Sequence, residues 1–334
     1  MILVVSKYFG YNVGGAERSM EEILKRKGED YIYIKFHNLK HYNAQELINN
    51  GLLGKQIGLF WFGDFRLFPF TGAILNTLVY RKKLKGIVRS YGITEIYAYG
   101  FFACAVLGIS SARKSLFIRD ESAFGELTNY HRGSRYFIYK IYQLLEFPGR
   151  YFWKAIMRNI NWDTVFYNSR FMQNRNTLKL KVTSEIVRYP QIDLSSLITS
   201  YNFWKTKSKQ SYITFVGDSY VKGIEIFKYL VEKLDEVEFL HIGEVNVDAK
   251  NVTNWNYCDI GKVFASTSLL LVPSQWQEAY GRIVREAVLL GIPTVASNTG
   301  GISEAADSSV TLINSFKDGE VWLASVKEKI EYLK

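Results

Sequence analysis

The sequence predicts an α/β protein built from two doubly wound, Rossmann-like domains. Short apolar runs rich in β-branched and aromatic residues alternate with amphipathic helical stretches, as in parallel sheets covered by helices. The segment from Asp193 to Gln210 is polar, and the alternation restarts after it. The chain has 334 residues, 48% of them hydrophobic, which suffices for two buried cores. We therefore expect domains at residues 1–200 and 201–334, with a ligand cleft between them.

In the first domain, five apolar runs predict buried strands, and three longer stretches with apolar residues at helical spacing predict helices. The strands are expected at Ile2–Val5, Tyr31–Phe36, Glu95–Tyr99, Leu116–Ile118 and Thr164–Tyr167. The helices are expected at Ala16–Lys27, Ala73–Arg89 and Arg135–Ile160.

The second domain repeats this alternation in a shorter stretch of chain. Its strands are expected at Tyr212–Val216, Phe239–Ile242, Leu269–Val272, Thr294–Ala296 and Val310–Ile313. Its helices are expected at Gly223–Leu234, Arg282–Leu290 and Asp318–Leu333.

Several protein classes are disfavoured by what the sequence contains. No charge-free apolar stretch reaches the roughly 20 residues of a membrane span, and the start resembles a strand rather than a signal peptide. Cys104 and Cys258 are expected to be reduced thiols of a cytoplasmic protein, with no disulfide framework or zinc site. A NAD-dependent dehydrogenase is disfavoured because no G-x-G-x-x-G follows the first strand.

Positive charge is concentrated in the first domain. Residues 1–200 carry 28 Lys and Arg against 15 Asp and Glu, a net +13, whereas the remainder carries 14 against 17, a net −3. The basic stretches Arg81–Arg89 and Arg132–Arg158 are interleaved with aromatic residues, which suits an anionic membrane surface at the inner face of the plasma membrane. The alternatives are a solubility bias or core helices with solvated charges. Nucleic acid is the less favoured partner, because no RNA-binding motif accompanies these stretches.

The most informative stretch runs from Leu269 to Ala305. A buried strand ends at Pro273, and Glu278 and Glu286 then stand eight positions apart with Gly281 between them. A carboxylate accepts hydrogen bonds from sugar hydroxyls, and a glycine at a helix start lets the backbone approach a diphosphate. The alternative is a solvated helix with two ordinary glutamates.

This stretch resembles the E-x7-E region of glycosyltransferase family 4, whose members have the GT-B fold. The residues that match are Glu278, Tyr280, Gly281, Glu286, Gly291 and Pro293, followed by Gly300, Gly301 and Glu304. The resemblance implies that Glu278 contacts hydroxyls of the transferred sugar and that Glu286 binds the ribose hydroxyls. It also implies that backbone amides around Tyr280–Arg282 meet the donor.

Two further segments resemble phosphate-binding parts of the same family. Gly14 and Gly15 resemble its N-terminal glycine loop, although the pair alone is also typical of a plain turn. Gly217, Lys222 and Gly223 resemble a segment in which Arg and Lys neutralise the diphosphate. Asp218 stands where that Arg is usual, so Lys222 is expected to carry this role, with Arg282 as a substitute. The alternative for Lys222 is a surface lysine at a helix start.

Asp120 and Glu121 are the remaining candidate catalytic residues. They end a strand near the point where many family members have a His, and His131 lies too far along to replace it. Their side chains are expected either to contact the sugar or the acceptor hydroxyl, or to cap the next segment.

The expected activity is therefore a retaining transfer from a nucleotide sugar such as a UDP- or GDP-sugar to a glycan or lipid-linked acceptor. No cofactor is expected, and no metal, because no D-x-D pattern ends a strand. The rivals are a nucleotide-sugar epimerase on the same fold and a non-catalytic partner protein with the GT-B fold. A structure that buried either Glu278 or Glu286 in a structural ion pair, or turned it toward bulk solvent, would overturn the assignment.

Overall fold

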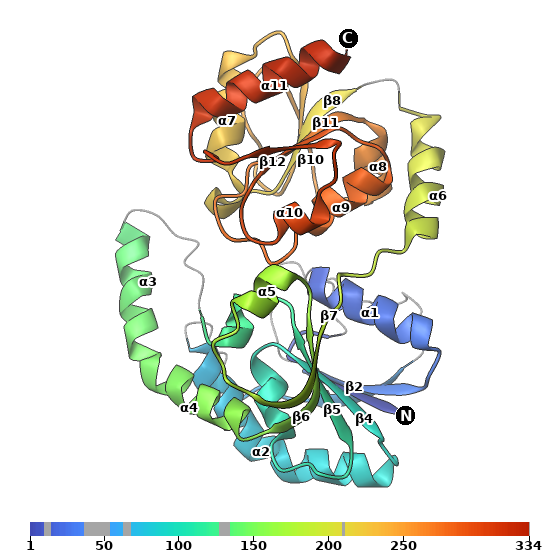
Figure 1. Cartoon of the computed structure of the whole chain (residues 1–334), viewed down its shortest axis with the longest axis vertical. Helices are drawn as coiled ribbons and strands as arrows, with labels where there is room; N and C mark the ends of the chain where they lie inside the picture. The colour runs from blue at the N-terminus through green and yellow to red at the C-terminus, as the bar shows by residue number, and fades with distance from the viewer. Residues whose placement is uncertain (10–14, 37–53, 63–67, 127–133, 209–210, 334) are drawn as a thin grey trace. The chain divides into compact units, whose positions relative to one another are not determined.

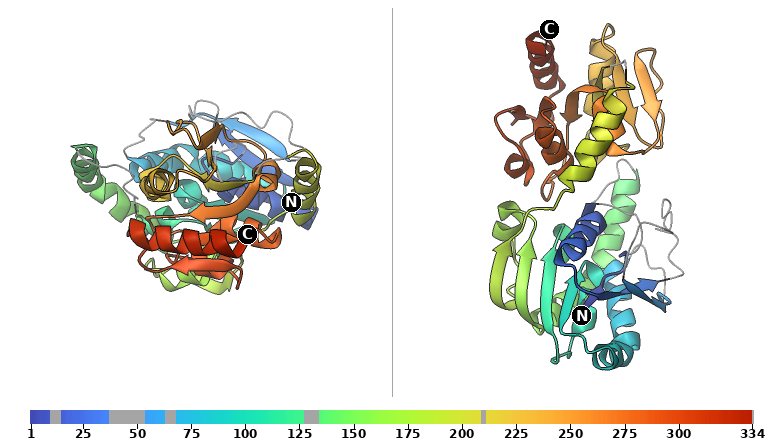
Figure 2. Two further views of the ribbon diagram at one scale, coloured as in Figure 1. Left: turned by 90° about the horizontal axis from the view of Figure 1, so that it is seen from above. Right: turned by 90° about the vertical axis from the view of Figure 1, so that its right-hand side faces the viewer.

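The protein consists of two compact units, Met1–Gln191 and Ile192–Lys334. The computed structural model describes residues 1–9, 15–36, 54–62, 68–126, 134–208 and 211–333. Each unit contains a sheet whose described strands are all parallel, with helices beside it (Figures 1 and 2). The predicted fold class of two Rossmann-like domains is confirmed.

In the described residues, the first unit has a seven-stranded sheet in the order β3-β2-β1-β4-β5-β6-β7. Its strands are β1 Ile2–Val5, β2 Tyr31–Phe36, β3 Lys55–Leu59, β4 Glu95–Tyr99, β5 Arg113–Ile118, β6 Asn161–Tyr167 and β7 Lys181–Val187. Its helices are α1 Gly15–Lys27, α2 Pro69–Ser90, α3 Ser134–Leu145, α4 Phe147–Arg158 and α5 Arg170–Asn174, with short 3-10 helices η1 Phe101–Val106 and η2 Glu121–Phe124.

The two faces of this sheet are covered differently. Helix α1 packs Met20 and Leu24 into a cluster with alternate residues of β1, β2 and β4. Helices α2 and α4 cover the other face, where Phe70 contacts Trp153 edge to face at 5.2 Å. The Trp153 indole also donates to the carbonyl oxygen of Phe101, at 2.8 Å. Helices therefore pack on both faces of this sheet.

The single helix predicted over Arg135–Ile160 is two helices, α3 and α4. The break falls at Glu146, whose side chain is fully buried. Its carboxylate accepts hydrogen bonds from the backbone N–H groups of Phe70 and Thr71, at 2.7 and 2.9 Å, at the start of α2. Pro148 follows in the first turn of α4, where a missing N–H costs nothing. A contact made 76 residues away in sequence therefore sets the break.

None of the helices in the described part of the chain has both the length and the apolar character needed to cross a membrane. Helix α2 is 22 residues long but carries five basic residues in its second half.

In its described residues, the second unit has a six-stranded sheet in the order β10-β9-β8-β11-β12-β13. Its strands are β8 Tyr212–Val216, β9 Phe239–Ile242, β10 Val252–Trp255, β11 Thr267–Val272, β12 Thr294–Ser297 and β13 Val310–Ile313. Its helices are α6 Leu194–Lys205, α7 Ile224–Lys233, α8 Ile260–Ala265, α9 Arg282–Leu289, α10 Ile302–Ala305 and α11 Gly319–Leu333, with the 3-10 turn η3 Tyr220–Lys222.

The segment expected to be a polar linker, Asp193–Gln210, contains helix α6, so the units divide earlier in the chain than residue 200. Asp193 caps α6 by accepting a hydrogen bond from the Ser196 N–H, at 3.0 Å. Helix α6 then packs on α8, where a Cβ atom at Gly261 would lie 2.4 Å from the Ser200 hydroxyl. Helix α6 is therefore held by close backbone packing on α8. Its sequence lacks the long apolar run from which a helix would have been predicted.

Candidate functional site

The centre of the candidate site is the carboxylate of Glu278, in the loop between β11 and α9. Its Oε1 atom accepts hydrogen bonds from Lys222 Nζ at 2.6 Å and from Ser274 Oγ at 2.9 Å. Burial acts to raise the pKa of Glu278, but the Lys222 charge and hydrogen bonds from Lys222, Ser274 and Trp276 outweigh it, so the pKa is lowered. The side chain is therefore an ionised acceptor held beside a cation.

Two close backbone approaches fix this cluster. Gly300 has φ +60°, and a Cβ atom there would lie 2.2 Å from the Glu278 carbonyl oxygen. The neighbouring Gly301 N–H donates to that oxygen at 2.7 Å. Gly223, directly after Lys222, has φ +91°, and a Cβ atom there would lie 1.9 Å from the Pro273 carbonyl oxygen. Glycine is therefore required at both places, because any side chain would displace the loop that carries Glu278 or the turn that carries Lys222.

Glu286 lies one turn inside α9 and is mostly buried. Its Oε1 atom accepts a hydrogen bond from Arg282 Nε at 2.7 Å. Gly281 precedes the helix with φ +86°, so the backbone turns sharply into the N-terminus of α9. Arg282 Nη1 is buried and has no hydrogen-bond partner among the described residues. An anionic ligand at the start of α9 would meet this guanidinium and the helix amides together.

Both predicted carboxylates are thus held in ion pairs, and burial of either one in a purely structural ion pair would overturn the assignment. In each pair, however, the cation is itself one of the residues assigned to the donor, Lys222 or Arg282. The Lys222 side chain keeps 41% of its exposure, so a ligand can reach its ammonium group. The ion pairs bring together residues that were all assigned to the donor. Whether these residues bind the donor is a question for the experiments described below.

Asp218 stands where the family that this segment resembles usually has Arg, and the structure gives a reason for the difference. Its carboxylate accepts hydrogen bonds from the backbone N–H groups of Glu244 at 2.9 Å and Val245 at 3.2 Å, which begin the segment after β9. A Cβ atom at Gly243 would lie 1.9 Å from Asp218 Oδ1, so Gly243 makes room for this contact. Gly217 similarly leaves room for the Lys222 side chain, 3.1 Å from the position of its absent Cβ. The Asp218 carboxylate therefore stabilises the loop that follows β9 by accepting hydrogen bonds from its backbone.

In the first unit, Asp120 and Glu121 have other partners. Asp120 caps η2 by accepting from the Ser122 N–H at 2.9 Å, which is the capping alternative. Glu121 forms an ion pair with Arg175 at 3.3 Å. Burial raises the pKa of Glu121, and the Arg175 charge opposes that shift. Gly15 is the first residue of α1. Gly14 and His131 lie outside the described residues.

Sequence reasoning missed a buried polar group in the first turn of α1. Glu17 is 7% exposed, and burial raises its pKa to about 7. Nearby, Arg119 Nη1 donates to Ser19 Oγ at 2.7 Å, just after the end of β5. Helical spacing could have revealed Glu17, because it lies three and seven positions before Met20 and Leu24 on the buried face.

Groups of three or more His, Cys, Asp or Glu side chains suited to a metal ion are absent from the residues that the structure describes. Cys104 is buried and Cys258 exposed, and both are free thiols.

Comparison with known proteins finds a family match within the second unit. Residues 210–328 match the family model described as "Glycosyl transferases group 1". A curated relative, the "Uncharacterized 42.6 kDa protein in cps region" of Klebsiella pneumoniae, is 27% identical over 109 residues. That match spans 30% of this chain and only 29% of the relative.

Solved structures resemble the whole chain. Sucrose-phosphate synthase of Thermosynechococcus elongatus is 14% identical with a TM-score of 0.71, over 99% of this chain and 90% of that one. HepE of Anabaena, solved with UDP and glucose, is 16% identical with a TM-score of 0.67, over 99% and 89%. WaaG, a glycosyltransferase involved in lipopolysaccharide biosynthesis, is 14% identical with a TM-score of 0.56, over 99% and 94%. The chain therefore has the GT-B fold, its second unit resembles the group 1 glycosyl transferases, and these similarities support a glycosyltransferase.

Proposed function

We propose that this protein is a retaining, metal-independent glycosyltransferase that uses a nucleotide-diphosphate sugar. The observation that carries the proposal is the Lys222–Glu278–Ser274 cluster, which sets a cation and an ionised acceptor side by side within the part of the chain that matches the family model. HepE of Anabaena has been solved in complex with UDP and with UDP-glucose, which favours a donor of this class.

In the proposed reaction, the bond between the anomeric carbon and the diphosphate oxygen breaks, and a bond to the acceptor oxygen forms on the same face of the sugar. Lys222, Arg282 and the amides at the start of α9 stabilise the charge that develops on the diphosphate. Glu278 accepts hydrogen bonds from sugar hydroxyls once Lys222 turns to the phosphate. The acceptor proton passes to the departing phosphate oxygen, so the step needs no side-chain base. Glu286 accepts from the ribose hydroxyls.

Donor binding is the first test. A thermal-shift screen against UDP, GDP and their sugars is expected to find a stabilising nucleotide, because a ligand at about 100 times its dissociation constant adds about 2.7 kcal/mol. Glu286→Gln is expected to weaken binding of that nucleotide by about tenfold or more, since a hydrogen bond to a charged group contributes about 1.5–3 kcal/mol. Glu225→Gln, at an exposed position in α7, is the matched control.

Failure of every nucleotide to stabilise the wild-type protein would contradict the proposal and favour a non-catalytic partner protein. Conversion of a nucleotide sugar to its isomer without an acceptor would instead identify an epimerase.

For the acceptor, we propose a lipid-linked glycan of surface polysaccharide or glycolipid assembly, reached from an anionic bilayer at the cytoplasmic face. The support is the surface of α3 and α4, where large apolar side chains are exposed: Phe137, Ile138, Ile141, Leu144, Leu145, Phe147, Tyr151 and Phe152. Those on α3 recur at helical spacing, so they form one apolar stripe. Arg150 and Lys154 stand among them on α4. Apolar groups flanked by cations suit a bilayer interface.

Flotation with anionic vesicles tests this surface. The protein is expected to float with vesicles containing phosphatidylglycerol and to lose binding as salt rises, because screening weakens attraction to the lipid charge. Replacing Phe137, Ile141 and Leu144 together by Ser is expected to reduce partitioning by roughly 1,000-fold or more, since each buried apolar side chain contributes about 1.5 kcal/mol or more. Phe203→Ser with Val245→Ser, two exposed apolar positions of the second unit, is the control. Equal flotation of the triple variant would rule the surface out.

A further inference from the structure

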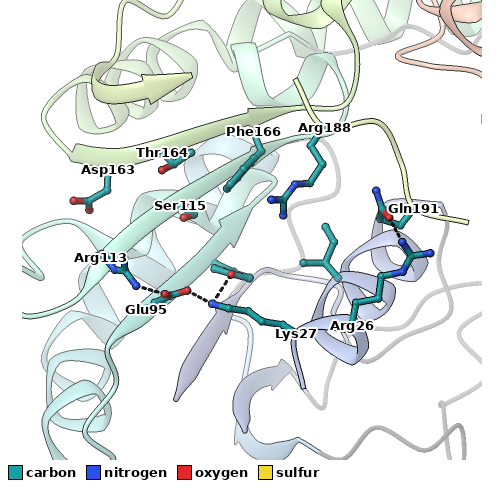
Figure 3. Close-up of a pocket in the computed structure, with 12 residues that line it drawn as sticks. Arg26, Lys27, Glu95, Arg113, Ser115, Asp163, Thr164, Phe166, Arg188 and Gln191 are labelled. Atoms are coloured by element: carbon teal, nitrogen blue, oxygen red, sulfur yellow. Dashed lines mark hydrogen bonds and ion pairs between the residues drawn. The ribbon is translucent and has the colours of Figure 1, made fainter. Parts of the chain in front are cut away.

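A polar pocket of about 620 Å³ lies within the first unit, and no residue that lines it belongs to the candidate site. Its walls come from the last turn of α1, from β4, β5 and β6, and from the segment after β7 (Figure 3). Pockets of roughly 300–1,000 Å³ are the size that small-molecule ligands occupy.

The pocket exists because α1 covers only part of its face of the sheet. Met20, Ile23 and Leu24 of α1 pack over β1, β2 and β4. Beyond them, Phe166 of β6 stacks on Phe117 at 4.8 Å and stays partly exposed. Parallel sheets are ordinarily covered on both faces. Within the residues that the structure describes, the strip along β5 and β6 beyond α1 forms this pocket and can receive a ligand.

Positive charge dominates the lining. Four cations, Arg26, Lys27, Arg113 and Arg188, face two carboxylates, Glu95 and Asp163. Glu95 is shared between Lys27, at 2.5 Å, and Arg113. Asp163 accepts a hydrogen bond from the backbone N–H of Lys114 at 2.8 Å. The lining keeps a net positive charge that an anionic ligand would neutralise.

Arg188 is the cation best placed to bind such a ligand. Its guanidinium lies over the Phe166 ring, 4.4 Å from the centroid, and Figure 3 shows the two side chains together at the edge of the pocket. None of the carboxylates in the described residues forms an ion pair with it. Arg26 approaches from α1 and donates a hydrogen bond to the Gln191 side chain. An aromatic support fixes the plane of a guanidinium and leaves its N–H groups available.

We propose that this pocket binds a soluble, phosphate-bearing small molecule of about the size of a sugar phosphate. Guanidinium groups bind phosphate oxygens in a two-pronged geometry, which assigns the phosphate to Arg188 and Arg26. The hydroxyls of Ser115 and Thr164, which line the floor, can exchange hydrogen bonds with sugar hydroxyls.

The ligand is soluble rather than a lipid headgroup because of where the pocket opens. It lies on the α1 face of the sheet, whereas α4 packs on the opposite face through Trp153. A bilayer that contacts α3 and α4 would meet the side of this unit away from the pocket. Binding here does not depend on the activity proposed above.

Calorimetric titration with glucose 6-phosphate, inorganic phosphate and glucose tests the proposal on the full chain. Glucose 6-phosphate is expected to bind the wild-type protein at millimolar concentration or below, and uncharged glucose is expected not to bind. Arg188→Gln is expected to weaken binding of glucose 6-phosphate by about tenfold or more. Arg89→Gln, an exposed arginine at the end of α2, is expected to leave binding unchanged.

Four outcomes would overturn the proposal. In the first, neither glucose 6-phosphate nor inorganic phosphate binds at about 10 mM, a concentration that would detect even weak binding. Glucose 6-phosphate binds Arg188→Gln and wild type equally. Binding is lost in Lys222→Met and kept in Arg188→Gln, which would place the phosphate in the donor site. A further arm uses vesicles containing phosphatidic acid: binding that needs Arg188, in a protein that ignores glucose 6-phosphate, would place the phosphate on a lipid and overturn the soluble ligand.

Discussion

Glu278→Gln is expected to lower the rate of sugar transfer by about 100-fold or more while the protein remains folded. The substitution keeps the shape of the side chain but removes the negative charge that holds Lys222 Nζ at 2.6 Å. It also replaces one acceptor oxygen by a donor, which mismatches a sugar hydroxyl. Removing one well-placed polar group from a charge-stabilising site commonly costs about 10²–10³ in rate. Initial rates with the donor identified by thermal shift provide the measurement.

The same experiment separates a functional carboxylate from a structural one. Lys222 is partly exposed and can be solvated when its partner is neutral, so the melting temperature of Glu278→Gln is expected to stay near that of wild type. A double-mutant cycle with Lys222→Met is expected to be strongly non-additive, because the two residues act on one leaving group. Glu225→Gln serves again as the control. Full transfer activity in Glu278→Gln would refute the proposed role outright.

Local patterns predicted the elements whose residues are buried. Strands β1, β2, β4, β8 and β9 have the bounds expected from their apolar runs, because a parallel strand covered on both faces consists of apolar residues almost throughout. Strands β3 and β7 were missed because they lie at the edges of the sheet and alternate little between buried and exposed positions. β10 was missed for a related reason, since its four residues are all half-buried.

The site shows the same division between local and distant determinants. The motif resemblance placed Glu278, Gly281 and Glu286 on one loop and helix, as the structure has them. It did not reveal that Lys222 and Glu278 are hydrogen-bonded to each other across 56 residues. Nor could it show that Asp218 accepts from amides 26 and 27 residues later. Such pairings depend on which loops are brought together by the order of strands in the sheet. No single segment of the sequence specifies that order.

Glu17→Gln is expected to change how the stability of the first unit depends on pH. Burial raises the pKa of Glu17 from 4.5 to about 7 in the folded protein. Below about pH 4.5 the carboxyl is protonated whether the chain is folded or not. Between pH 4.5 and 7 the folded state binds more protons than the unfolded state, so the free energy of unfolding falls as pH rises. Above pH 7 the loss is complete, and the pKa difference corresponds to about 3 kcal/mol.

A glutamine cannot ionise, so the variant lacks this loss. Relative to wild type, Glu17→Gln is expected to become more stable by up to about 3 kcal/mol between pH 5 and pH 8. Hydrogen exchange of amides in β1 and β4 measures the effect within the unit that contains Glu17, which avoids assuming that both units unfold together. Asp30→Asn, an exposed carboxylate beside the same helix, should change the exchange equally at both pH values. A pH-independent difference between Glu17→Gln and wild type would show that Glu17 is ionised throughout, and its carboxylate would then need a cation within the buried first turn of α1.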